Sequence, residues 1–86
     1  GRPREAEAAA RQALYLDREL VMAHILRGQS LARLGKRAAA VHAFENARLL
    51  LERLDAEAPV PASDGQPAGA LLDRVMSHLR LLREAG

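Results

Sequence analysis

Small and apolar residues recur in this chain at a spacing of 34 residues. Four pairs of such residues coincide when the sequence is shifted by that distance: Ala6 and Ala40, Ala10 and Phe44, Ala13 and Ala47, and Leu16 and Leu50. A period of this length is typical of helix–turn–helix repeats, in which each unit buries its apolar face against its neighbours. The spacing therefore predicts an all-α fold of stacked helices.

The composition agrees with closely packed helices. Hydrophobic residues make up 49% of the 86-residue chain, mostly Ala and Leu, whereas aromatic residues make up 2%. The chain has no Cys, which excludes disulfides, thiolate metal sites and a cysteine nucleophile. No apolar run approaches the roughly 20 residues that cross a bilayer, and the N-terminal segment GRPREAEAAARQ is too polar for a signal peptide. We therefore expect a cytoplasmic location and no membrane insertion.

Apolar periodicity predicts four helices, over about residues 3–16, 17–34, 37–54 and 67–84. Asp17 offers a side-chain oxygen as the N-cap of the second helix, and Gly35 suits its C-terminal end. Between the third and fourth helices the composition changes to APVPASDGQP, which predicts a loop.

Six residues match the spacing of small and large positions in the tetratricopeptide repeat family: Gly28, Leu31, Gly35, Ala40, Phe44 and Ala47. On these residues the chain resembles that family, with His24, Arg27 and Glu52 departing from its usual aromatic, Leu and Pro. The resemblance implies about one and a half repeats with a C-terminal capping helix. Residues 1–17 are then the second helix of a truncated repeat, 18–54 a complete helix pair, 55–66 a loop, and 67–86 the capping helix.

A second element narrows the resemblance. The motif SDG-x-x-AG-x-LL comprises Ser63, Asp64, Gly65, Ala68, Gly69, Leu71 and Leu72. Following directly on the repeat, it resembles the repeat-bearing C-terminal extensions of CheR-type chemotaxis methyltransferases, bacterial signal-transduction enzymes that methylate receptor glutamates with S-adenosylmethionine. The resemblance implies that this segment is a protein-binding appendage that positions or regulates the enzyme, and that methyl transfer belongs to an N-terminal part of the parent protein.

Catalytic, metal-binding and cofactor-binding signals are absent from the sequence. His24, His42 and His78 fall on three different predicted helices and form no zinc-binding spacing. Ser30, Ser63 and Ser77 have no flanking nucleophile motif, and no predicted strand precedes a glycine-rich turn. Arg residues are interleaved with Glu and Asp, and the net charge is only +2, which disfavours nucleic-acid binding. We predict no catalytic residue, no metal site and no cofactor.

A binding surface is the favoured functional feature. In the family resembled, the first helix of a repeat lines the concave face, and by register five residues point there: Met22, Ile25, Gln29, Ala32 and Arg33. We call these residues the concave stripe. Its mixed character suits a partner helix or extended peptide with an apolar anchor and an acidic group. The alternative left open is that the C-terminal helix packs on this stripe and fills the groove.

The resemblance implies a protein or peptide partner: a chemoreceptor, another signalling protein or the parent's own catalytic domain. A homodimer is a separate hypothesis, in which Ala6, Ala10 and Ala13 of the first helix pair with a second copy. Two other functions remain open. One is a scaffold or co-chaperone repeat module from an unrelated protein, and the other is a direct contribution to S-adenosylmethionine-dependent methyl transfer.

Overall fold

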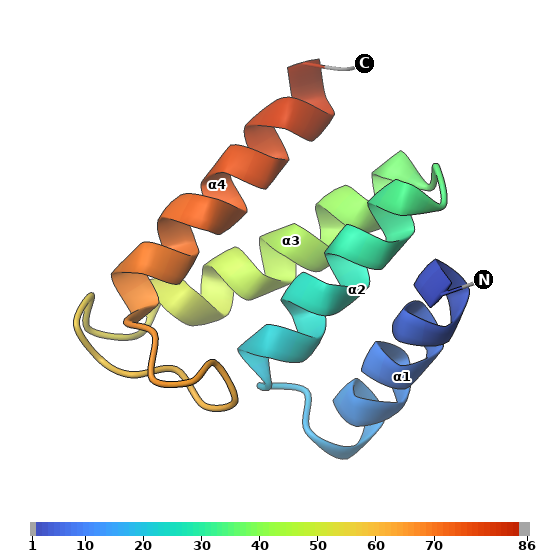
Figure 1. The fold of residues 1–86 in the computed structure, drawn as a ribbon. Coiled ribbons are helices and arrows are strands. Elements are labelled where there is room, and N and C mark those ends of the chain that lie inside the picture. Colours follow the sequence, from blue (N-terminus) through green and yellow to red (C-terminus); the bar gives the residue numbers. More distant parts are fainter. Residues whose placement is uncertain (1, 85–86) are drawn as a thin grey trace.

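The computed structural model describes residues 2–84, which form four α-helices and no strand. They are α1 (Arg2–Leu16), α2 (Val21–Arg33), α3 (Arg37–Glu52) and α4 (Ala68–Glu84). Each helix packs against the next along the chain, so that α1, α2, α3 and α4 lie side by side with alternating directions (Figure 1). The predicted all-α, helical-repeat-like fold is confirmed. Residues 1, 85 and 86, at the ends of the predicted N- and C-terminal segments, lie outside the described residues.

The turn between α1 and α2 differs from the sequence prediction. The N-cap residue of α2 is Leu20 rather than Asp17. The carboxylate of Asp17 instead accepts a hydrogen bond from the backbone N–H of Glu19 at 3.0 Å. Because Asp side chains readily bond to the backbone two residues onward, Asp17 stabilises the connecting turn, and the helix starts one turn later.

The turn between α2 and α3 closes on Gly35, which has a φ of +77°. The N–H of Lys36 donates to the carbonyl of Leu31 at 2.9 Å, and the N–H of Gly35 donates to Ala32 at 3.1 Å. This pair of bonds is the Schellman arrangement, which satisfies the last carbonyls of a helix and requires a left-handed residue. Gly adopts that conformation without the steric cost of a side chain, so α2 ends here and α3 can fold back on it.

The core lies where α2, α3 and α4 meet. Its main cluster contains ten buried side chains: Val21, Ile25, Phe44, Ala47, Leu51, Val60, Ala68, Leu71, Val75 and Leu79. A smaller cluster of Leu31, Ala40 and Ala43 lies towards the other end of α2 and α3, and Leu82 of α4 packs on both clusters. The C-terminal helix is therefore an integral part of the core.

The loop before α4 is held by one buried side chain. The hydroxyl of Ser63 donates to the carbonyl of Val60 at 2.6 Å and accepts from the backbone N–H of Gln66 at 3.0 Å. At the base of the loop the N–H of Gly69 donates to the carbonyl of Ala56 at 2.8 Å. A Cβ on Gly69 would lie 3.1 Å from both the Cβ and the carbonyl oxygen of Ala56. The SDG and AG parts of the sequence motif thus shape the entry to α4.

Candidate functional site

The concave stripe is only partly exposed. Ile25 is buried in the main core cluster with residues of α4, and Met22 packs half-buried against the same cluster. Ile25 is therefore a core residue in this structure and offers a partner no side-chain surface. Near the C-terminal end of α2, Gln29 and Ala32 are half-buried and Arg33 is exposed. The part of the stripe that a partner can reach is this second half.

Behind the stripe, α2 and α3 cross at Gly28. A Cβ placed on Gly28 would lie 2.8 Å from Cε2 of Phe44, closer than a side chain can approach. The other residues of the repeat signature inside the helices, Leu31, Ala40, Phe44 and Ala47, are buried. Phe44 also stacks on the imidazole of His78 from α4, at 4.7 Å between ring centroids. One aromatic ring therefore joins three helices.

His24 and Arg27, two of the residues that depart from the repeat pattern, hold α1 and its turn onto α2. The buried His24 bonds through Nε2 to the carbonyl of Arg18 at 2.8 Å, so Nε2 carries the proton. Nδ1 of the same ring is buried and has no hydrogen-bond partner among the described residues. Nε of Arg27 lies 3.9 Å from Oε2 of Glu7 on α1. Polar contacts here replace the apolar ones that an aromatic and a Leu would make.

The three histidines lie apart. His24 is buried in α2, His42 is exposed on α3, and His78 is half-buried on α4. Burial, together with the nearby positive charge of Arg74, lowers the pKa of His78 below its ordinary value of 6.5. Within residues 2–84, no cluster of three or more His, Asp or Glu side chains is arranged to hold a metal ion.

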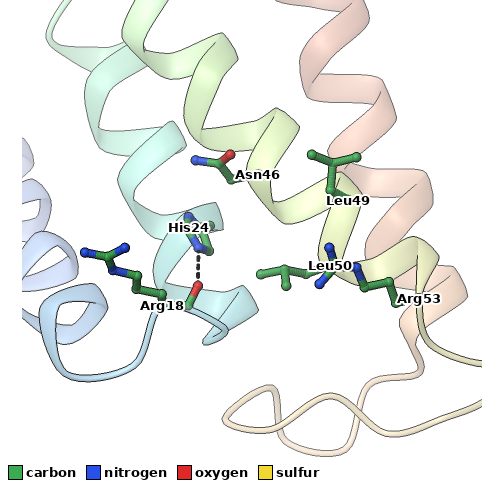
Figure 2. Close-up of a pocket in the computed structure, with 6 residues that line it drawn as sticks. All are labelled: Arg18, His24, Asn46, Leu49, Leu50 and Arg53. Atoms are coloured by element: carbon green, nitrogen blue, oxygen red, sulfur yellow. Dashed lines mark hydrogen bonds between the residues drawn. The ribbon is translucent and has the colours of Figure 1, made fainter.

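A hollow beside His24 is the feature that sequence reasoning missed. Six residues line its volume of about 310 Å³: Arg18, His24, Asn46, Leu49, Leu50 and Arg53. In Figure 2, Leu50 and the guanidinium of Arg53 extend from α3 towards His24, and Asn46 lies near the imidazole. Asn46, Leu49 and Leu50 of α3 share one helical face with Arg53, the C-cap of that helix, at spacings of three and four. That pattern is visible in the sequence, but the wall formed by His24 and the α1–α2 turn is not.

A second hollow adjoins the first, because both are lined by Leu50 and Arg53. It extends towards Leu54 and Pro61, and its rim carries Asp17 and Glu19 of the α1–α2 turn. We call the two hollows together the His24 groove. Arg53 lies where the two hollows meet. The groove is apolar on the side of Leu49 and acidic on the side of the α1–α2 turn.

The predicted self-association face on α1 is partly covered within the chain. Ala10 is buried, and Ala6 and Ala13 are half-buried. Tyr15 and Leu16, at the end of the helix, are 87% and 81% exposed. The apolar surface that α1 leaves open thus lies mainly at its C-terminal end, and a homodimer through the three alanines stays a prediction.

Comparisons of this chain with protein-family models, with curated proteins and with solved structures found no match. Among the described residues, no helix has the length and apolar character needed to cross a membrane.

Proposed function

We propose that this chain is a protein-interaction module that binds a segment of a partner protein along the exposed half of the concave stripe. The observation that supports it is the exposed Arg33 beside half-buried Gln29 and Ala32 at the end of α2. This surface is backed by the close crossing at Gly28 and by the buried Leu31, so we expect its backbone to be rigid. A rigid surface loses little conformational entropy when a partner binds.

The chemistry of the surface favours an acidic partner segment. Arg33 supplies a guanidinium in the last turn of α2, and Gln29 can donate and accept hydrogen bonds one turn earlier. A carboxylate and a guanidinium can form two parallel hydrogen bonds, a bidentate pair that the ammonium group of a lysine cannot form. An acidic residue followed by a polar or small apolar residue is therefore the segment expected to bind.

More narrowly, we propose that the module belongs to a cytoplasmic chemotaxis-type receptor methyltransferase, where it positions or regulates the enzyme. The resemblance of the Ser63–Leu72 motif supports this, since the same residues build the loop and the first turn of α4. In this proposal the module binds the receptor, a signalling protein or the parent's catalytic domain, and takes no part in methyl transfer.

The test is an NMR titration of the isotopically labelled chain with a chemoreceptor cytoplasmic fragment, with S-adenosylmethionine as the comparison ligand. We expect saturable shifts at Gln29, Ala32 and Arg33 with the receptor fragment and none with the cofactor. Arg33→Glu should raise Kd about fivefold or more, because the charge is reversed. Arg80→Glu, on an exposed part of α4, is the matched control and should leave Kd unchanged.

Two results would contradict this proposal. Binding that Arg33→Glu does not weaken would place the contact elsewhere on the fold. Shifts with S-adenosylmethionine instead of the receptor fragment would favour a direct part in methyl transfer.

A further inference from the structure

The His24 groove lies at the opposite end of α2 from Arg33 and carries chemistry of its own. Its first hollow has aliphatic walls from Leu49 and Leu50, and Leu49 is 49% exposed although it is apolar. Asn46 adds an amide, and two arginines line the hollow: Arg18, and Arg53, which Figure 2 shows extended beside Leu50. Among the described residues that line this hollow, none is acidic.

A hydrogen-bond acceptor in the wall lacks a donor. Because Nε2 of His24 carries its proton towards Arg18, Nδ1 presents a lone pair, and nothing in the described residues donates to it. A buried polar atom without a partner costs free energy. A ligand N–H group that reaches Nδ1 removes that cost, and because Nδ1 is buried this requires a side chain of the wall to move.

We propose that the His24 groove is a second docking site, which binds an extended peptide of a partner protein through an aliphatic, an acidic and a basic residue in that order along the groove. The aliphatic side chain packs on Leu49 and Leu50, the carboxylate pairs with Arg53, and the basic group meets Asp17 and Glu19. The backbone of an extended peptide has free N–H groups, one of which bonds to Nδ1 of His24.

The length and charge of the groove favour a peptide over a single small molecule. Two hollows joined at Leu50 and Arg53 can hold groups on alternate residues of one strand, since these point to the same side and lie about 6.6 Å apart. The positive charge of Arg53 and the negative charges of Asp17 and Glu19 also favour a ligand that carries both an acidic and a basic group. An extended chain meets both conditions.

The experiment uses two probe peptides, acetyl-Leu-Ala-Glu-Ala-Lys-amide and the reversed order acetyl-Lys-Ala-Glu-Ala-Leu-amide. Each is titrated into the isotopically labelled chain while amide and imidazole signals are followed by NMR. We expect at least one order to give saturable shifts at His24, Asn46 and Leu49. Replacing Glu by Gln in that peptide, or Arg53 by Gln in the protein, should raise Kd about fivefold.

Two further variants keep the result specific. Leu49→Ser changes a half-exposed side chain, leaves the buried core untouched and should also weaken binding. Arg33→Glu, which tests the concave stripe, should leave peptide binding here unchanged. Failure of both peptides to give saturable shifts, or binding that Arg53→Gln leaves as tight as before, would overturn the proposal without touching the function proposed for the stripe.

Discussion

The imidazole of His78 lies flat against the ring of Phe44, with the ring planes 7° from parallel and the centroids 4.7 Å apart. The stack joins α4 to α3, and Gly28 brings α2 against the same aromatic ring. The position of three helices thus depends on one ring and its two neighbours, and this makes the arrangement testable by substitution and by pH.

The first prediction concerns the stability of the protein at acidic pH. The folded protein lowers the pKa of His78, first through burial and then through Arg74, so the unfolded chain takes up a proton at a higher pH. The stability that neutral His78 contributes is therefore fully present above its unfolded-state pKa of 6.5. It is lost as the pH falls from there towards the pKa in the folded protein. We expect a lower free energy of unfolding in urea at about pH 5.5 than at about pH 7.5.

The control for this prediction is His78→Phe, which keeps a ring against Phe44 and cannot titrate. The fall in unfolding free energy over the same pH range should be smaller in this variant. Glu45 does not confuse the comparison, because its hydrogen bond with Arg48 lowers its pKa below 4.5. An equal pH dependence in both proteins would show that His78 is not responsible.

The second prediction concerns the central ring. Phe44 is fully buried, so Phe44→Ala removes its contacts with Gly28 and His78 and leaves a cavity among three helices. Substitutions of this kind cost about 3–5 kcal/mol. Urea unfolding followed by circular dichroism measures the loss, and an almost unchanged midpoint would contradict the packing described here.

The third prediction concerns the crossing at Gly28. Ala is better than Gly in a helix by about 1 kcal/mol, yet the added Cβ would lie 2.8–2.9 Å from three atoms of Phe44. Overpacking of this kind costs about 1–3 kcal/mol, so we expect Gly28→Ala to destabilise the protein. The smaller side chain in Phe44→Leu should relieve the clash. A double-mutant cycle of the two changes should therefore show a favourable coupling, whereas additive effects would place the clash elsewhere.

The fourth prediction concerns the loop before α4. Ala62 is exposed and has a φ of +67°, a left-handed conformation that costs a residue with a side chain about 1–2 kcal/mol. Ala62→Gly removes this strain, although part of the gain is lost because Gly makes the unfolded chain more flexible. We expect a net gain of about 0.5–1 kcal/mol, read from thermal unfolding. The exposed Ala70 in α4 provides the opposite case, since Ala70→Gly should destabilise by a similar amount.

The helices themselves could be predicted from the sequence because their apolar spacing is a local property. The predicted third helix, residues 37–54, compares with Arg37–Glu52 in the structure, and Gly35 ends α2 as its backbone freedom suggests. The prediction of Asp17 as an N-cap was wrong. Its carboxylate can either cap a helix or stabilise a turn, and in the structure it accepts the turn hydrogen bond from the backbone N–H of Glu19.

The surface was harder to predict, because exposure depends on which distant segment covers a helix. Ile25 has the register of a concave residue, but Leu71, Val75 and Leu79 of α4 complete the cluster that buries it. The His24 groove is harder still, since its walls come from the α1–α2 turn, the end of α3 and, at Pro61, the following loop. Periodicity within one helix contains no information about such a meeting of segments.

Each helix packs mainly on its neighbours along the chain, so the helices differ in how much buried contact holds them in place. α1 meets the rest of the fold through α2 and buries a single residue, Ala10, whereas α3 packs between α2 and α4 and buries five. Local opening requires the loss of few contacts in α1 and of most of the core in α3. α2 packs between α1 and α3 and buries seven residues. Amide hydrogens should therefore exchange with solvent fastest in α1 and slowest in α2 and α3, so that α1 can rearrange while the central crossing stays closed.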